Sequence, residues 1–310
     1  MKVLKYINIL IAIILISSCD DQIYPELNDA PEILVVDAWV NDKPEDQVIK
    51  LTRTQPYFDN SESNGVSGAE VYLTDNEGTR FDFVDSGSGD YVWSYTTEVF
   101  GTTGNSYRLT VNTGGETFTA TSIKNRVPTV DSVTFKFENK IDFGQEDEYY
   151  LGEFWSRDLE GFGDTYWIKS FKNEEYLGKP SEINIAWDAG FSEGGAIDGL
   201  IFIPPIRDAV NPFDEKEDTE GEFYSPFADG DSLYVEVHSI TPAAHSFLSE
   251  LRIQTDRPGG FAALFDTPLS NIPTNIENTT SDELVVGFFC VSSVEGNGNR
   301  LDISQVPKEE

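Results

Sequence analysis

Residues 70–95 read EVYLTDNEGTRFDFVDSGSGDYVWSY, and this stretch decides the fold class. Val71 and Leu73 face one way along the chain, and Phe81 and Phe83 alternate with an aspartate. A period of two places one set of side chains on the core face of a β-sheet. Glycine-containing turn segments separate the apolar runs. The stretch therefore predicts consecutive short strands joined by turns.

The same pattern continues on both sides of this stretch. Strands are expected at 33–40, 48–52, 70–74, 80–84, 91–95, 107–111 and 117–121. Short strands at this spacing are typical of an immunoglobulin-like β-sandwich. We therefore predict a first domain of this type over residues 32–126, followed by a linker at 124–129.

A larger β-rich domain is predicted over residues 127–310. Strands are expected at 132–137, 149–154, 166–171, 183–187, 200–203, 233–239 and 284–291, and long loops over most of 188–231. One amphipathic helix is expected near 242–254, because Thr241 can cap it and Pro242 suits its first position. The fold class is therefore mainly β, with an N-terminal sandwich and a larger β-rich domain that carries one helix.

The N-terminus has the layout of a secretory signal. Lys2 and Lys5 precede a short charge-free run, which ends in Ile16-Ser17-Ser18-Cys19. The run is too short to span a bilayer, which takes about 20 apolar residues. A cysteine at the cut point resembles the bacterial lipobox, which implies removal of residues 1–18 and lipidation of Cys19. The alternative is a plain secreted protein with a cysteine at this position.

An acidic tether is predicted over residues 19–31. Asp20 and Asp21 follow Cys19 directly and resemble the surface-export signal of Bacteroidota lipoproteins. The alternative is an ordinary polar linker.

The formal charge of −34 restricts the partners of the chain. A polyanion repels nucleic acid and anionic lipid surfaces, so we expect no nucleic-acid partner. We interpret the negative charge as a means of keeping the protein soluble; the alternative is that it captures basic ligands or cations. With Cys19 lipidated, Cys290 would have no disulfide partner, and its apolar surroundings predict a buried strand cysteine rather than a catalytic thiol.

Few residues qualify for chemistry. The two histidines, His238 and His245, are more typical of structural or surface positions than of a metal site or a catalytic base, and HExxH, CxxC, GxSxG and phosphate-loop patterns are lacking. The acidic run 214–222 and the cluster Asp158, Glu160 and Asp164 are interpreted as solvated loops, because neither has calcium-loop spacing. We therefore expect no metal, no cofactor and no catalytic residue. A hydrolase with dispersed carboxylates is the least favoured alternative.

Loop aromatics are the other functional indication. Pro56, Tyr57 and Phe58 lie in a long polar loop over 55–68, which is a candidate interaction loop. Further aromatics in or near loops are Phe162, Trp187, Phe191, Phe213, Phe223, Tyr224 and Phe227. Such rings anchor protein and carbohydrate contacts, and they equally pin loops onto a core.

Several segments together resemble a known family. They are the lipobox, the runs 33–40 and 48–54, the segments 56–60 and 66–69, the hinge 127–133, and the segments 271–276 and 285–289. This order is similar to the Bacteroidota lipoprotein family that is catalogued as domain of unknown function 4249. The resemblance implies no catalytic residue. It implies a surface lipoprotein that lies on or beside an outer-membrane β-barrel.

The functional expectation combines these points. We expect a non-catalytic accessory subunit, held in the outer membrane by its lipid and facing the cell exterior. Its partner would be an outer-membrane β-barrel protein, either a TonB-dependent transporter or the barrel-assembly machinery. The alternative is a stand-alone surface binding protein for a glycan, a peptide or a cation.

Overall fold

The computed structural model describes residues 31–56, 59, 61–142, 145–194, 196–212, 224–257 and 270–308, without the side chains of 140–147. Glu32–Gln55 and Asp59–Glu310 belong to one compact unit, to which the whole description below refers. Within the described residues, no helix is both long enough and apolar enough to cross a membrane.

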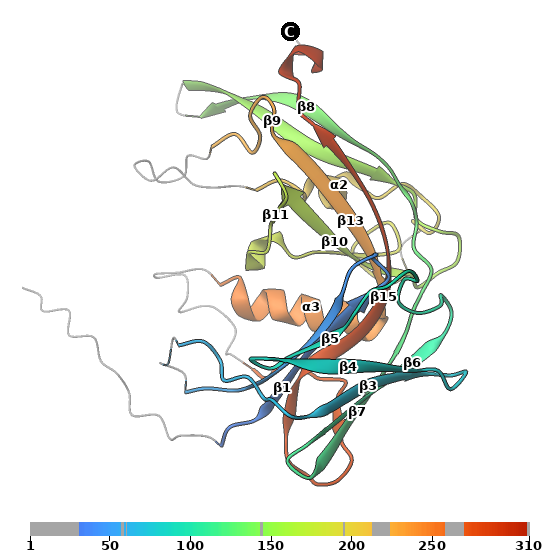
Figure 1. Ribbon diagram of the computed structural model, residues 1–310. Helices are drawn as coiled ribbons and strands as arrows, with labels where there is room; N and C mark the ends of the chain where they lie inside the picture. The colour runs from blue at the N-terminus through green and yellow to red at the C-terminus, as the bar shows by residue number, and fades with distance from the viewer. Residues whose placement is uncertain are drawn as a thin grey trace, which may run out of the picture. The chain divides into compact units, whose positions relative to one another are not determined.

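The strands expected in the first part are all present. They are β1 (Leu34–Asn41), β2 (Gln47–Arg53), β3 (Glu70–Asp75), β4 (Arg80–Gly87), β5 (Asp90–Trp93), β6 (Ser106–Thr113) and β7 (Glu116–Ile123) (Figure 1). Their order in the sheet is β1-β2-β5-β4-β3-β6-β7, followed by the short β14 (Glu277–Asn278). The mainly β fold class is confirmed, and the immunoglobulin-like arrangement stays a prediction.

The core of this part lies between two halves of the folded sheet. Alternation along β1 buries Leu34, Val36, Ala38 and Val40, which pack with buried residues of β3, β6 and β7. The halves are joined through β4, which pairs with β3 on one side and with β5 on the other. This arrangement leaves the other face of β1 free to form a second surface.

The second part extends the same sheet and adds a hairpin. Its elements are β8 (Val130–Asp142), β9 (Gln145–Ser156), β10 (Thr165–Lys172), β11 (Glu175–Tyr176), β12 (Asn184–Trp187), β13 (Ser232–Ile240), β15 (Val285–Arg300), α2 (Pro204–Asp208), α3 (Pro242–Thr255) and two 3-10 turns (Pro180–Glu182 and Ile303–Gln305). The strands β8 and β9 form a separate hairpin, whose buried side chains pack with those of β10 and β13.

The last strand, β15, connects the two parts. Its first half pairs in parallel with β1, from Val285 opposite Leu34 to Ser292 opposite Asn41. Its second half pairs with β13 in antiparallel fashion. The sheet therefore continues across the predicted boundary at residues 126 and 127, and the division into two domains stays a prediction.

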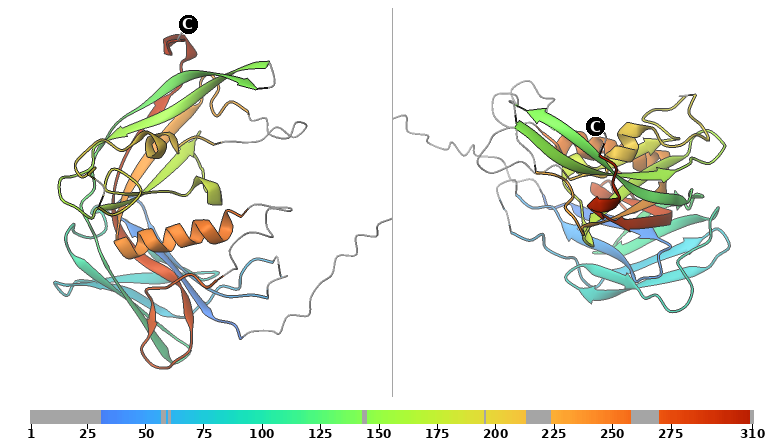
Figure 2. Two further views of the ribbon diagram at one scale, coloured as in Figure 1. Left: turned by 180° about the vertical axis from the view of Figure 1, so that it is seen from behind. Right: turned by 90° about the horizontal axis from the view of Figure 1, so that it is seen from above.

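The helix expected after Thr241 is confirmed as α3. The Thr241 side chain accepts a hydrogen bond from the Ala244 amide, which satisfies one of the unpaired donors at the helix start. Ala244 and Leu248 are buried against Ile185, Ile240 and strand β15. In Figure 2, α3 is seen beside the sheet from behind. The helix covers the sheet face that the β8–β9 hairpin leaves free.

Two expectations about elements were wrong. The expected strand at 200–203 is only a single bridge between Ile201 and Arg157. It cannot continue, because Pro204 and Pro205 lack the amide donors that a strand needs, and α2 begins there instead. The strand expected to end at residue 291 continues to Arg300. Gly296 and Gly298 lie within this strand, and Tyr234 covers both, so a side chain at either position would meet its ring.

Candidate functional site

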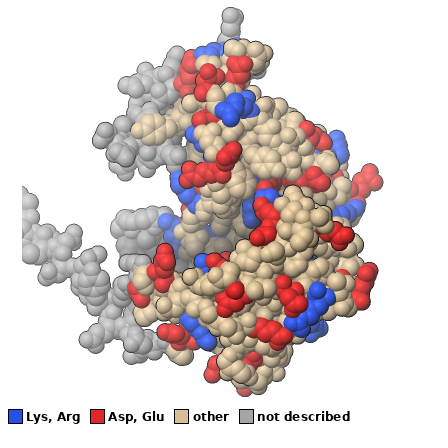
Figure 3. Space-filling model, in the orientation of Figure 1, with Lys and Arg blue, Asp and Glu red and all other residues tan. Residues whose placement is uncertain are grey.

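A cleft of about 910 Å³ opens on the outer face of β1. The residues that line it include Val35, Asp37, Trp39, Lys50, Glu62, Ser63, Asn64, Gly65, Ser88, Trp167, Tyr176, Gly178, Ile183, Phe247, Leu248, Leu251 and Phe288. Figure 3 shows this face of the molecule hollowed, with basic and acidic side chains both present around the hollow. The volume is in the range of small-molecule and peptide sites.

One end of the cleft is aromatic. Trp39 projects from β1 on the side opposite the sandwich core, because Ala38 and Val40 occupy the core side. Its ring stacks on Phe288 at 5.6 Å between centroids and meets Trp167 edge-on at 5.1 Å. Phe247 of α3 completes the cluster at 4.7 Å from Phe288. Rings held in this way present a large apolar surface at low entropic cost.

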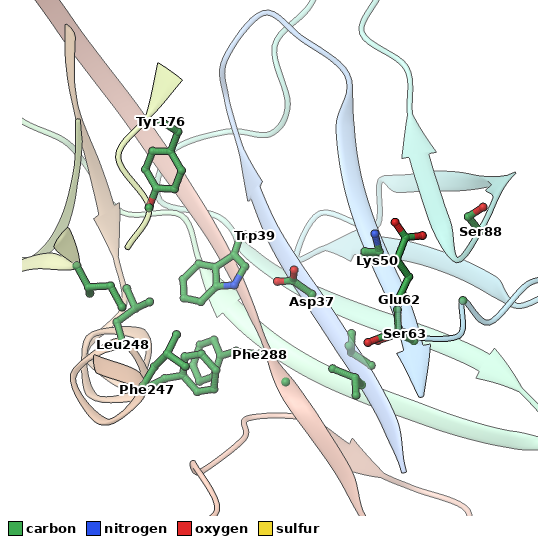
Figure 4. Close-up of a pocket in the computed structure, with 18 of the residues that line it drawn as sticks. Asp37, Trp39, Lys50, Glu62, Ser63, Ser88, Tyr176, Phe247, Leu248 and Phe288 are labelled. Carbon is green, nitrogen blue, oxygen red and sulfur yellow. The ribbon is translucent and has the colours of Figure 1, made fainter. Parts of the chain in front are cut away.

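The other end of the cleft is polar. Figure 4 shows Asp37 beside Trp39, with Lys50, Glu62 and Ser63 beyond it. Although solvent reaches Asp37, desolvation by the cleft walls raises the pKa of its carboxyl, and the charges of Lys169 and Lys50 oppose that rise. The cleft thus joins an apolar wall to a charged one, which suits an amphipathic ligand.

A buried charged group supports the sheet next to the cleft. Glu236 of β13 contacts Lys43 Nζ at 2.8 Å and His238 Nε2 at 3.0 Å. Burial alone would raise the pKa of Glu236, but hydrogen bonds from His238 and Lys43 outweigh it and lower that pKa to about 2. Burial lowers the pKa of His238 to about 4. At neutral pH the imidazole is therefore neutral, and its Nε2–H donates to the carboxylate.

Lys169 lies between this group and the cleft. Its Nζ lies 3.9 Å from the ring centroid of Trp167, which lines the cleft. Burial lowers the pKa of Lys169 to about 8, although the charge of Glu236 opposes that decrease. The Lys169 ammonium therefore releases its proton more readily than the ammonium of an exposed lysine does.

The comparisons with known proteins give one family. The model of DUF4249, described as a domain of unknown function, matches residues 20–297. The chain belongs to this family. No curated protein matches this DUF4249 chain. The matched region begins directly after Cys19 and contains every residue of the cleft.

Five of the six residues predicted for lipidation, export or interaction lie outside the described part of the DUF4249 chain. They are Cys19, Asp20, Asp21, Tyr57 and Phe58. Pro56 is described and exposed. Further along the same predicted interaction loop, Glu62, Ser63, Asn64 and Gly65 line the cleft.

His238, His245 and Cys290 of the DUF4249 chain occupy separate structural positions. His238 is buried with Glu236 and Ser292, and His245 packs edge-on against Trp187 at 5.5 Å. Cys290 is 1 % exposed, which confirms the predicted buried strand cysteine, and burial raises its thiol pKa to about 11.

The aromatics expected in loops of the DUF4249 chain have different positions. Phe162, Phe191 and Tyr224 are exposed and Phe227 is buried, whereas Phe213 and Phe223 lie outside the described residues. The rings of the cleft come instead from strands and α3, and the sequence analysis missed them as site residues. In the sequence, only Trp39 indicated the cleft, because this large ring shares the outward-facing side of β1 with the polar residue Asp37.

Proposed function

We propose that the chain is a lipid-anchored, non-catalytic accessory subunit of an outer-membrane β-barrel complex. The observation that carries the proposal is the lipobox-like segment 16–19, directly ahead of a family match that starts at Asp20. The barrel is either a TonB-dependent transporter or the barrel-assembly machinery. The acidic pair Asp20 and Asp21 supports a position on the cell exterior.

The physical argument rests on confinement. Acyl chains contribute about 0.8 kcal/mol for each buried CH₂, so several chains on Cys19 hold a protein at the membrane. Confinement raises the local concentration of the subunit around its barrel, so a modest protein interface suffices. The described part of the interaction loop lies at the cleft, which offers a surface for that contact.

Cys19→Ala tests the anchor. In the native host, this variant is expected to move from the membrane fraction to the soluble fraction and to lose its barrel partner in mild-detergent pull-downs. Fractionation, with circular dichroism of the released protein, measures both effects. Ser18→Ala is the matched control, because a small residue before the cysteine preserves the cleavage site. A Cys19→Ala chain that stays in the membrane, or a native chain that recovers no barrel, contradicts the proposal.

A second candidate function is a stand-alone surface binding protein for a glycan or a peptide. The aromatic end of the cleft favours it, because rings such as Phe247 and Trp39 form stacking platforms. A panel of glycans and aromatic peptides, titrated by calorimetry into the Cys19→Ala chain, should then give heat without any barrel present.

Phe247→Ala tests whether such a ligand occupies the cleft. A buried aromatic anchor contributes about 2 kcal/mol or more, so this variant should weaken a cleft ligand roughly thirtyfold. Phe162→Ala is the control, because that ring is 76 % exposed and lies outside the cleft. Absence of heat across the panel, together with a stable barrel complex, favours the accessory subunit.

A further inference from the structure

Three aspartates meet at one point away from the cleft. Asp158 follows β9, whereas Asp188 and Asp198 both lie in the loop between β12 and α2. One carboxylate oxygen of each lies within 4.8 Å of the other two. Asp158 and Asp188 are only 2 % and 1 % exposed. Three acidic groups are thus held together largely out of water.

Hydrogen bonds fix these carboxylates but do not satisfy them. Asp158 accepts from the Tyr166 hydroxyl at 2.6 Å and from the Gly199 amide at 3.0 Å. Asp188 Oδ1 accepts from the Gly163 and Asp164 amides at 2.8 and 3.0 Å. Its other oxygen, Oδ2, is buried and has no hydrogen-bond partner in the described part of the chain.

An unpaired buried carboxylate oxygen is costly. It loses its hydration without gaining a hydrogen bond, and such groups in native proteins usually face an ion or an ordered water. The orphan oxygen therefore indicates, independently of the clustering, that a ligand belongs beside Asp188.

The charges in this region are also unbalanced. The nearby Arg126 is already paired with Asp164 Oδ2 at 2.7 Å and donates to the Glu160 carbonyl. Among the described residues, no lysine or arginine forms an ion pair with Asp158, Asp188 or Asp198. The carboxylates of Asp158, Asp188 and Asp198 therefore repel one another. A bound cation would remove this repulsion.

We propose that Asp158, Asp188 and Asp198 form a Ca²⁺ site. A purely carboxylate donor set suits a hard divalent cation. Ca²⁺ accepts oxygens at about 2.3–2.6 Å in irregular geometry, so oxygens up to about 5 Å apart can contact one ion. Mg²⁺ fits less well, because it demands near-ideal octahedral geometry and keeps its waters. Asp198 is only partly buried, which leaves the ion a route from solvent.

The ion would join two loops that present exposed rings. Phe162 lies in the loop between β9 and β10, and Phe191 lies in the loop after β12. These rings are 76 % and 56 % exposed. Ca²⁺ thus fixes how the two loops display their rings, independently of the anchor and of the cleft.

Terbium luminescence tests the site on the full-length chain in mild detergent, after chelator treatment. Tb³⁺ binds Ca²⁺ sites, and Trp187, next to Asp188 in the chain, serves as the sensitiser. Sensitised emission is expected, with reversal by Ca²⁺ at millimolar levels or below and little reversal by equal Mg²⁺. Ca²⁺ should also raise the unfolding temperature by about 5 °C at saturation.

Asp188→Asn supplies the decisive comparison. Its amide oxygen can still accept from the two backbone amides, so the variant should fold, while Ca²⁺ affinity falls roughly tenfold or more. In chelator, Asp188→Asn should unfold at the same or a higher temperature than the native chain, because it relieves like-charge repulsion. Glu193→Gln removes one exposed charge from the same loop and should leave Ca²⁺ binding unchanged.

Three results would overturn the site. The first is a native chain without Ca²⁺ binding up to about 10 mM, well above the range of extracellular calcium modules. The second is binding that Asp188→Asn leaves intact, since the ion then lies elsewhere, for example on the acidic run 214–222. The third is an Asp188→Asn chain that is less stable in chelator, because the aspartate then has a purely structural role.

Discussion

Gly287→Ala is expected to lower the free energy of unfolding by about 4 kcal/mol. Gly287 has φ of +102° and lies opposite Val36 in the parallel pair of β1 and β15. A Cβ at this position would lie 2.0 Å from the Val36 carbonyl oxygen and 2.8 Å from its amide nitrogen. The strained backbone costs about 1–3 kcal/mol, and overpacking against a central strand costs a similar amount.

Gly78→Ala is the matched control for this prediction. Gly78 has φ of +89°, but a Cβ there would meet nothing within 4 Å. It should therefore lose only the strain contribution, about 1–2 kcal/mol. Urea denaturation followed by tryptophan fluorescence measures both variants. If Gly287→Ala and Gly78→Ala lowered the free energy of unfolding equally, the close approach of β1 and β15 would contribute nothing to the cost of the substitution.

Acid is expected to destabilise the protein through His238. The unfolded histidine has a pKa of 6.5, whereas burial lowers the folded pKa to about 4. Between these values the unfolded chain binds a proton that the folded chain excludes, so stability decreases as the pH falls. The expected loss from pH 6.5 to 4 is about 3 kcal/mol.

Glu236 continues this loss at lower pH. Its folded pKa of about 2 is below the ordinary 4.5, so its contribution is complete above pH 4.5 and decreases as the pH falls toward 2. Below that window the Lys43–Glu236 ion pair is lost as well. The protein is therefore expected to lose stability first through His238, between pH 6.5 and 4, and then through Glu236 as the pH falls further toward 2.

His238→Gln tests the assignment. An amide can still donate to Glu236 but takes up no proton, so the slope of stability between pH 6.5 and 4 should become much smaller. Urea titrations at pH 7 and pH 4.5 measure it. His245→Gln should have a weaker effect in the same direction, because burial also lowers the pKa of His245. A larger effect of His245→Gln would contradict the role of His238.

The strands could be predicted because their signal is local. Val71, Leu73 and Phe83 alternate within a few residues, and all three are buried as the period of two requires. The helix was predictable for the same reason, since Thr241 and Pro242 mark its start. Strand β15 was underestimated because its second half is fixed by pairing with β13, a contact that is distant in the sequence.

The cleft and the aspartate cluster could not be predicted, because both depend on distant contacts. Trp39 becomes a cleft residue only when Phe288 and Trp167 pack around it. Asp158 was interpreted as part of a solvated acidic loop, which was wrong because the residue is only 2 % exposed. Its sequence neighbour Asp164 pairs with Arg126, whereas Asp188 and Asp198 reach Asp158 from another loop.

The pairing of β1 with β15 has a consequence for synthesis. Leu34–Asn41 emerge from the ribosome early, and their partner Val285–Ser292 emerges near the end. At about 5–20 residues per second, this delay is roughly 10–50 s. Until then β1 presents an unpaired edge that invites wrong pairing. The central sheet therefore cannot form in the order in which the chain is synthesised. A chaperone that binds the nascent N-terminal half should increase the yield of folded protein.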